Sequence, residues 1–295
     1  MSAQLPQAFV ERMAARLKDE LPAFLRSYEE PYCRGIRFQP GKPLPPAAWP
    51  AGVGEQIPWE PAARYLAMES DAGTMVLHEA GGWYLQEPSA MAPVAALNPQ
   101  PGERVLDLCA APGGKSTQIA AHLGGKGLLV SNEPVPKRAA VLSRNLERMG
   151  ATNALAVSAY PDQLAAQWPA YFDAVLVDAP CSGEGMFRRH PETREEWSPE
   201  APAGCAKRQR EILAAAARLV RPGGRMVYST CTLNTMENEE NISWFLREHS
   251  DFSVCPFQLP GVDGTAGMAT LFPHRVRGEG HFLALLVRQG EDVET

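Results

Sequence analysis

Two short segments of the sequence carry residues that could do covalent chemistry. The first, Asp178 to Gly185, contains a carboxylate followed closely by a cysteine, Cys181. The second, Tyr228 to Thr232, contains another cysteine, Cys231. A cysteine thiolate is a strong nucleophile, and a carboxylate beside it can move a proton or stabilise developing charge. Two thiols and a carboxylate at one site would therefore favour a reaction that passes through a covalent bond to sulfur.

Carbon 5 of a pyrimidine is a methyl acceptor that requires such a thiol. It is too weak a nucleophile to attack a sulfonium methyl group directly, but addition of a thiolate at carbon 6 converts the ring into an enamine whose carbon 5 can attack. A carboxyl group at ring N3 or at the exocyclic amine would stabilise the developing charge, and a base must then remove the carbon 5 proton. Cys231, Cys181 and Asp178 supply such a set, although spacing alone does not order the two thiols.

A turn of small residues after an earlier predicted strand indicates a nucleoside-binding site. Its candidate cofactor contacts are Cys109, Ala110, Ala111, Pro112, Gly113, Gly114 and Lys115. A Walker A phosphate loop would need glycine where Cys109 stands, and the turn also lacks the G-x-G-x-x-G of dinucleotide sites. Glu133 ends the next predicted strand, where an acidic side chain usually accepts hydrogen bonds from ribose. S-adenosylmethionine (SAM), a nucleoside with a charged amino-acid tail and no phosphates, fits these features.

The order of predicted elements places these segments at one edge of a parallel sheet. After about residue 101, short apolar runs alternate with helical patterns, which is typical of a doubly wound, Rossmann-like α/β sheet covered on both faces. Strands are expected at 104–108, 127–132, 154–158, 173–177, 225–229, 252–257 and 281–288, and helices at 115–123, 135–149, 207–220 and 236–248. Neighbouring strands open onto one crevice at their carboxyl ends, so Asp178, Cys181 and Cys231 are expected to meet beside the cofactor.

The N-terminal third of the sequence has a different texture. Apolar residues recur every four positions from Phe9 to Leu21 and predict a helix, interrupted near Pro22. The proline-rich stretch 39–61 predicts a long connection, because proline cannot donate to a sheet ladder.

Composition excludes several classes of protein. The chain has 295 residues, 45% hydrophobic and 21% charged, so it can form a sizeable core and is not intrinsically disordered. No apolar run is long enough to cross a bilayer and no signal-peptide pattern opens the sequence, so a cytoplasmic protein is expected. The net charge of −6 argues against a protein that coats nucleic acid through bulk charge. The six cysteines form no C-x-x-C pair, so neither a metal site nor a disulfide framework is expected.

Four stretches, in this order, match the pattern of one enzyme family. They are Tyr84 to Ala90, Val105 to Lys115, Asp178 to Gly185, and Tyr228 to Thr232 with Glu237 to Glu239. Through them the sequence resembles the RNA cytosine-C5 methyltransferases of the Sun-type superfamily, and within it the bacterial RsmF-like branch that modifies small-subunit ribosomal RNA. The resemblance extends over most of the chain.

The resemblance implies a role for each residue singled out above. Cys231 would be the nucleophile, and Cys181 would assist release of the methylated product. The turn from Cys109 to Lys115 would contact SAM and Glu133 would hold its ribose. Asp178 would lie between the cofactor and the target base. The resemblance also implies that the last strand runs antiparallel to its neighbour.

The resemblance further implies the domains and the partner. We expect a smaller α+β, RNA-binding-like region at 1–95, a SAM-dependent methyltransferase domain at 96–290 and a tail at 291–295. The partner would be RNA, ribosomal RNA above all, bound by a monomer without metal or membrane. Three basic clusters could hold RNA phosphates: Arg188 to His190, Lys207 to Arg210, and His274 to Arg277.

Other functions stay open at this point. A transfer-RNA cytosine-C5 methyltransferase would share the chemistry, and so would a DNA cytosine methyltransferase, whose nucleophile would be the thiol of Pro180-Cys181. A small-molecule or protein methyltransferase has no use for two thiols. A non-catalytic RNA-binding assembly factor would retain SAM as a structural ligand, and its biological role would survive replacement of Cys231 by alanine.

Overall fold

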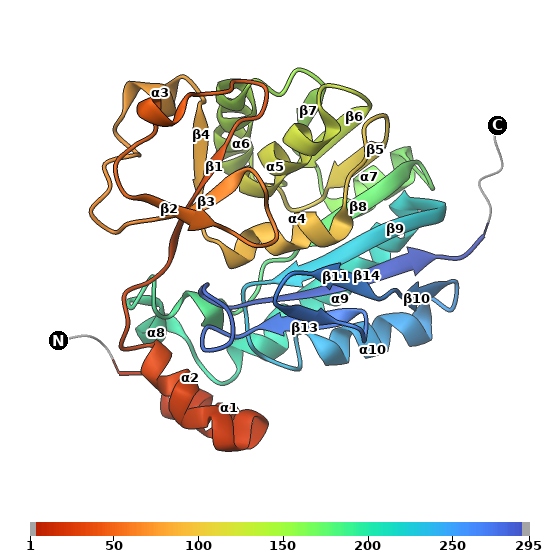
Figure 1. Ribbon diagram of the computed structural model, residues 1–295. Coiled ribbons are helices and arrows are strands. Elements are labelled where there is room, and N and C mark those ends of the chain that lie inside the picture. Colours follow the sequence, from red (N-terminus) through yellow and green to blue (C-terminus); the bar gives the residue numbers. More distant parts are fainter. Residues whose placement is uncertain (1–3, 291–295) are drawn as a thin grey trace.

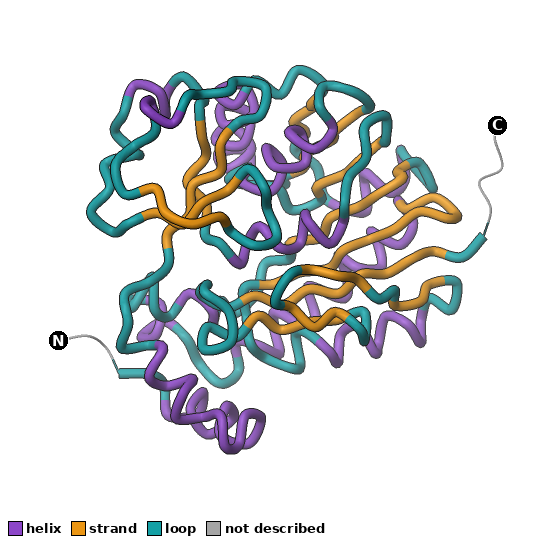
Figure 2. Tube along the Cα trace, viewed as in Figure 1, coloured by secondary structure: helices purple, strands orange, loops and turns teal. Residues whose placement is uncertain are grey.

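Figure 1 shows the computed structural model of the protein, which describes residues 4–290. Its larger part is an eight-stranded sheet in the order β10-β14-β9-β8-β5-β6-β7, with β13 also paired to β14. Figure 2 shows helices packed on this sheet and a smaller sheet in the N-terminal part. This is the predicted Rossmann-like α/β architecture with a smaller N-terminal α+β region. The predicted tail at 291–295 lies outside the described residues.

Five parallel strands form one side of the large sheet, from β9 to the edge strand β7. They are β5 (Arg104–Asp107), β6 (Leu128–Asn132), β7 (Ala154–Val157), β8 (Phe172–Asp178) and β9 (Val220–Thr230). The last strand, β14 (His281–Arg288), runs antiparallel to β9, as the resemblance implied. The outer edge of β14 pairs with β13 (Met268–Leu271) and with β10 (Phe252–Val254). A separate ribbon consists of β11 (Phe257–Leu259) and β12 (Val262–Gly264).

Helices cover both faces of the large sheet. One face is covered by α4 (Ala92–Leu97), α5 (Gly114–Leu123) and α6 (Pro136–Met149), and the other by α7 (Pro161–Gln167), α9 (Ala201–Leu219) and α10 (Glu239–Glu248). Val105 and Leu106, adjacent in β5, are both fully buried, one in each of the two cores. The central strands are therefore apolar without alternation. No helix within residues 4–290 is long and apolar enough to span a bilayer.

The order in which successive parallel strands are added to the sheet reverses between β5 and β8. From β5 the order runs through β6 to β7 on one side, and through β8 to β9 on the other. A crevice for ligands forms outside the carboxyl ends of the strands at such a point. Asp107 and Asp178 are the last residues of β5 and β8, so both carboxylates lie at this crevice.

Several predicted elements have different ends in the structure. Helix α9 begins at Ala201 rather than at residue 207, with Pro202 in its first turn, where a missing N–H costs nothing. Helix α10 begins at Glu239 rather than at 236, because the preceding residues form turns. The strand predicted over 252–257 is divided into β10 and β11, and Pro256 lies between them.

The N-terminal sheet has four antiparallel strands in the order β2-β3-β1-β4. They are β1 (Arg34–Phe38), β2 (Val53–Gln56), β3 (Ala63–Leu66) and β4 (Trp83–Gln86). Strand β2 lies inside the stretch 39–61, so the prediction of a connection without strands was wrong there. The four residues of β2 contain no proline, and this edge strand pairs only with β3 in an irregular register.

Two helices of the N-terminal region precede this sheet in the sequence. Helix α1 (Gln7–Leu17) ends at a short 3-10 turn, Lys18–Glu20, and α2 (Leu21–Ser27) follows it. The predicted interruption therefore comes just before Pro22, which occupies the first turn of α2. The remaining short helices are α3 (Val76–Glu79) and α8 (Thr193–Glu196), with 3-10 turns at Pro46–Ala48, Ser89–Met91 and Glu184–Met186.

A buried arginine joins the N-terminal sheet to the helix that follows the cofactor turn. The Arg37 side chain, on β1, is almost fully buried and donates to the carbonyl of Gly114 at 3.0 Å and to Oγ1 of Thr117 at 2.7 Å. It also donates to Oε1 of Gln86 at 3.2 Å. Burial lowers the pKa of Arg37 to about 10, so the guanidinium stays charged at neutral pH. The start of α5 is thus fixed against the N-terminal region.

Candidate active site

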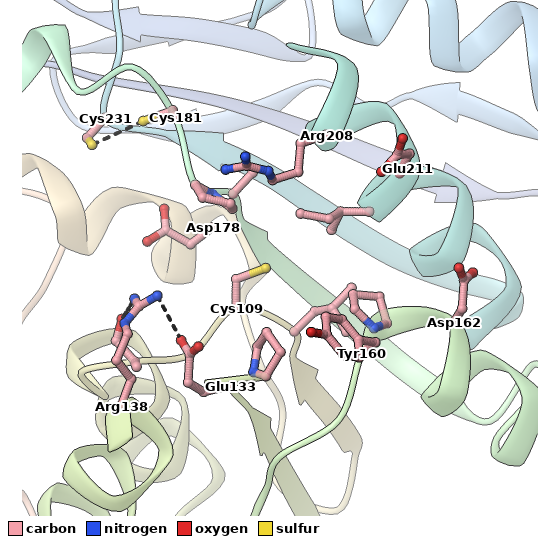
Figure 3. A pocket seen from close by; sticks show the side chains of 17 residues that line it. Cys109, Glu133, Arg138, Tyr160, Asp162, Asp178, Cys181, Arg208, Glu211 and Cys231 are labelled. Carbon is pink, nitrogen blue, oxygen red and sulfur yellow. Dashed lines mark hydrogen bonds and ion pairs between the residues drawn. The ribbon is translucent and has the colours of Figure 1, made fainter. Parts of the chain in front are cut away.

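A cavity of about 500 Å³ lies at the carboxyl ends of the parallel strands (Figure 3). Its lining includes Cys109, Glu133, Asp178, Cys181 and Cys231. The fold therefore brings the two thiols, the carboxylate, part of the cofactor turn and the predicted ribose ligand to one place. These residues come from four different strand ends, as expected for the crevice of a doubly wound sheet.

The cofactor turn lies between this cavity and a second one of about 390 Å³ that reaches the N-terminal sheet. Every residue of the turn except Gly113 lines one of the two cavities: Cys109, Ala110, Ala111, Pro112, Gly114 and Lys115. Gly113 is buried with φ +111, a conformation that favours glycine, and a Cβ there would lie 3.2 Å from Cδ1 of Leu142. Gly113 therefore shapes the turn, while its neighbours face the cavities.

Glu133 is almost fully buried just after β6, and both of its carboxylate oxygens are engaged. Oε1 accepts a hydrogen bond from the Val135 backbone N–H at 2.9 Å. Oε2 lies 3.2 Å from Nη1 of Arg138, a residue that lines the same cavity (Figure 3). A hydroxyl that binds Glu133 must share the carboxylate with Arg138. Sequence reasoning missed Arg138, because its contact depends on how α6 packs.

Asp178 is held as an anion at the end of β8. Its Oδ2 accepts a hydrogen bond from Nζ of Lys115 at 2.7 Å, and its Oδ1 accepts one from Oγ of Ser229 at 2.8 Å. Nε2 of His281 lies 3.5 Å from the same Oδ1. Burial alone would raise the pKa of Asp178, but Lys115 and His281 outweigh burial and hold the pKa well below its usual range.

The two candidate thiols are in direct contact. Sγ of Cys181 lies 3.2 Å from Sγ of Cys231 (Figure 3). The backbone N–H of Gly185 also donates to the Cys231 carbonyl at 2.8 Å. The hydrogen bond to Cys231, together with burial, raises the pKa of Cys181 well above its ordinary value. The raised pKa keeps the Cys181 thiol protonated at neutral pH.

Two buried polar residues beside Asp178 were missed by sequence reasoning. Asp107 is fully buried and accepts a hydrogen bond from Oγ of Ser116 at 2.6 Å, but its Oδ1 has no hydrogen-bond partner among the described residues. Burial raises the pKa of Asp107 to about 7. Its position at the end of the first predicted strand was a usable signal. His281 gave no such signal, because its approach to Asp178 depends on the antiparallel pairing of β14 with β9.

Comparison with known families decides the relationship. Residues 94–287 match the family described as 16S rRNA methyltransferase RsmB/F, and residues 5–88 match the N-terminal domain of 16S rRNA methyltransferase RsmF. The chain belongs to the RsmB/F methyltransferase family. The predicted resemblance is confirmed, and so is the predicted cofactor class, because this is a family of SAM-dependent methyltransferases.

Individual relatives extend this result. The chain is 36% identical over 303 residues to ribosomal RNA small subunit methyltransferase F of Salmonella agona (strain SL483) and 38% identical over 307 residues to that of Klebsiella pneumoniae (strain 342). Each alignment covers 95% of this chain and 63% of the relative, so the chain spans less than two thirds of their length.

Solved structures show the same fold. The structure of PH0851 matches with a TM-score of 0.87 and 30% identity, covering 96% of this chain and 66% of that one. The structure described as NSun6 from Pyrococcus horikoshii with SFG matches with a TM-score of 0.83 and 20% identity, covering 97% and 99% of the two chains.

One end of the large cavity is lined by the segment that follows β7, which begins with Ser158, Ala159 and Tyr160. Tyr160 and Asp162 both line the cavity, as Figure 3 shows. Asp162 also forms an ion pair with Arg218 of α9 at 2.6 Å, so this end of the cavity carries a carboxylate that is already paired.

The three basic clusters have different surroundings in this family member. Arg188 is buried and pairs with Glu279 at 2.6 Å, so it is a structural residue and the prediction of a phosphate contact was wrong for it. Its neighbour Arg189 lies over the ring of Tyr32. Both Arg189 and His190 line the second cavity. Arg208 lines the large cavity.

The third cluster is already neutralised. His274 and Arg275 both pair with Glu20, and Arg277 pairs with Glu55.

The cysteines outside the two chemistry-bearing loops and the cofactor turn line neither cavity: Cys33, Cys205 and Cys255.

Proposed function

We propose that this protein transfers a methyl group from SAM to carbon 5 of a cytosine in RNA, through a transient covalent bond between Cys231 and carbon 6. The observation that carries this proposal is the 3.2 Å contact between the thiols of Cys181 and Cys231 in a cavity that also contains Asp178. A methyltransferase whose acceptor is already a good nucleophile has no use for such a pair.

The residues around the cofactor turn fit SAM. When bound, SAM supplies an electrophilic methyl group. Glu133 would hold the ribose hydroxyls, and the backbone of the turn would approach the ligand through its small residues. Asp107 would pair with the ammonium group of the amino-acid tail, since its Oδ1 is buried without a hydrogen-bond partner among the described residues.

The two thiols have different roles in the proposed reaction. Cys231, as the thiolate, forms the bond to carbon 6, and the electron pair displaced in the ring makes carbon 5 nucleophilic. After methylation, a general base accepts the carbon 5 proton, the electron pair of that C–H bond re-forms the double bond between carbons 5 and 6, and Cys231 leaves as the thiolate. Cys181 assists this release, because its protonated thiol lies 3.2 Å from Sγ of Cys231 and can donate a hydrogen bond to the departing sulfur.

Asp178 provides selectivity for cytosine. Because its pKa is held low, its carboxylate accepts hydrogen bonds, and the exocyclic amine of cytosine can donate one. The carbonyl oxygen that uracil carries at the same position would be left facing an anion. A buried polar group without a partner is costly, so the site discriminates against uracil.

We propose that the RNA is ribosomal and that the protein acts as a monomer in the cytoplasm, without a metal ion. The matches to small-subunit ribosomal RNA methyltransferases support the substrate. We also propose domains at 1–95 and 96–290, which the separate N-terminal sheet supports.

Methyl transfer from labelled SAM to small-subunit ribosomal RNA tests the function, with base-resolved bisulfite sequencing of the product. We expect Cys231→Ala to abolish transfer and Cys205→Ala, a cysteine outside both cavities, to leave it unchanged. Cys181→Ala should form the covalent bond but release it slowly, so a protein–RNA adduct should accumulate on denaturing gels. An adduct formed by Cys231→Ala instead would reverse the assignment of the thiols. Methylation of transfer RNA in preference to ribosomal RNA would exclude the proposed substrate.

A further inference from the structure

Helix α1 packs directly against the two loops that carry the thiols. Its buried residues Phe9, Met13 and Leu17 form one apolar cluster with Phe187 and Leu233. Phe187 follows the Cys181 loop, and Leu233 follows Cys231. In Figure 1, α1 lies at one end of the molecule, away from the N-terminal sheet. The apolar face of α1 is thus shared between the two chemistry-bearing loops.

Arg12 of α1 ties the helix to the first loop. Its Nη2 donates to Oε1 of Glu184 at 2.5 Å, and Glu184 is fully buried in the 3-10 turn that follows Cys181. Nδ2 of Asn234, from the second loop, approaches the same oxygen at 3.4 Å. A buried carboxylate is costly without a charged partner, so Arg12 decides where Glu184 can lie.

Arg16, one helical turn later, ties α1 to the second loop. Its Nη1 donates to the carbonyl of Leu233 at 2.9 Å, and its Nη2 donates to Oγ1 of Thr270 at 3.0 Å. The same Nη2 pairs with Glu239 at the start of α10. Residues one turn apart lie on one face of a helix, so the two arginines reach the two loops from the same side of α1.

The two loops extend from β8 and β9, which pair as far as Asp178 and Ser229. Beyond these residues, contacts made by the loops set the distance between the thiols. The loops bond to each other through the Gly185 N–H and the Cys231 carbonyl at 2.8 Å, and through the hydroxyls of Ser182 and Thr232 at 2.8 Å. A rigid element that holds both loops at once would keep this arrangement in register. Helix α1 is such an element.

We propose that Arg12 and Arg16 are positioning residues, through which α1 holds the two loops so that the sulfur atoms of Cys181 and Cys231 stay in contact. The inference rests on the proposed function for the use of the thiols, but not for their geometry. It gives the N-terminal helix a part in the chemical step, beyond any contact of the N-terminal region with RNA.

The geometry can be tested without RNA or SAM, through exchange with glutathione. Oxidised glutathione accepts two electrons from the thiol pair, which closes a Cys181–Cys231 disulfide and releases two molecules of reduced glutathione. The equilibrium constant measures the effective concentration of one thiol at the other, and mass spectrometry reads it. We expect Arg16→Ala to lower this constant by about tenfold, because a loosened loop spends less time in contact.

Matched variants separate positioning from folding. Arg12→Gln combined with Glu184→Gln leaves no buried charge, so it should fold and still lower the equilibrium constant by a similar factor. Arg26→Ala removes an exposed arginine of α2 and should change nothing. The thermal midpoint of unfolding is measured for each variant as well. The order of the variants by thermal midpoint should differ from their order by disulfide equilibrium constant.

The kinetics of methyl transfer by the same variants give a second test of the inference. A misplaced thiol should lower kcat by about tenfold or more while the KM for SAM stays constant, because the cofactor turn is not touched. A wild-type pair that does not close, or variants of Arg12 and Arg16 that close as readily as wild type, would overturn the inference. A wild-type protein that closes its disulfide but methylates no RNA would refute the proposed function and leave the role of α1 standing.

Discussion

At the scale of single residues, the site separates charged from neutral groups by their neighbours. Asp178 and Asp107 end adjacent parallel strands, yet Lys115 and His281 lower the pKa of the first while burial raises that of the second to about 7. Burial and the hydrogen bond to Cys231 likewise keep the Cys181 thiol protonated. Contacts with neighbours thus make Asp178 an anion and leave Cys181 with its proton.

The raised pKa of Asp107 predicts how SAM binding depends on pH. At pH 6 this buried side chain is mostly protonated, whereas an ammonium group at Oδ1 favours the carboxylate, so binding releases a proton. As pH rises toward 7, the apparent Kd for SAM should therefore fall by up to about tenfold per pH unit, and above pH 7 it should level off. Titration calorimetry at pH 6, 7 and 8 in buffers of different ionisation enthalpy measures both effects.

The control is Asp107→Asn, which keeps the shape of the side chain and cannot titrate. It should bind SAM weakly and with no pH dependence in this window. The same pH slope in wild type and variant would show that another group titrates. In the protein without SAM, a rise in pH has the opposite effect: it lowers the stability of the fold. The pKa of Asp107 in the folded protein lies above the ordinary value of 3.8, so the stability that Asp107 contributes is lost as pH rises from about 4 to about 7.

At the scale of elements, Arg37 shows how the N-terminal sheet supports the cofactor turn. Replacing it with methionine leaves the carbonyl of Gly114, Thr117 and Gln86 without their shared donor in a buried place. We expect a loss of about 3 kcal/mol in the free energy of unfolding, measured by urea denaturation. Arg64→Met on neighbouring β3 should cost far less, because within residues 4–290 its donors reach the local carbonyls of Pro61 and Ala63 alone. Equal losses from the two variants would mean that the buried network contributes nothing particular.

The large sheet could be predicted from sequence because its central strands are buried on both faces and form unbroken apolar runs. The N-terminal sheet gave a weaker signal. Strand β2 is short, mostly exposed and enclosed by prolines, so its pairing with β3 depends on tertiary contacts that a local pattern does not carry. The early start of α9 was missed for a related reason, since Pro202 is compatible with a first helical turn but does not announce one.

At the scale of the whole molecule, the sequence predicted the residues that meet at strand ends and missed those that meet through docking. Asp178, Cys181 and Cys231 converge because parallel strands end at one edge. Arg12 and Arg16 reach the same loops from more than 150 residues away along the chain. Their positions follow from the packing of α1, for which amphipathic spacing gives a face but no partner.

Charge distribution over the whole molecule predicts how RNA binding depends on salt. The net charge is −6, so RNA must bind to local cations rather than to the bulk field. Arg189 lines the second cavity over Tyr32 and has no ion-pair partner among the described residues, whereas adjacent Arg188 is buried against Glu279. Arg189→Ala should therefore weaken RNA binding and reduce the slope of log K against log salt by about 0.7 to 0.9, the value of one phosphate contact.

Arg188→Ala is the matched control, because it removes the same charge from the next residue. It should lower the free energy of unfolding by about 3 to 5 kcal/mol by leaving Glu279 buried without its partner, with no change in the salt slope of the folded fraction. Filter binding between about 50 and 200 mM salt and thermal unfolding distinguish the two variants. If Arg188→Ala changed the slope and Arg189→Ala did not, RNA would contact the molecule through a different surface from the rim of the second cavity.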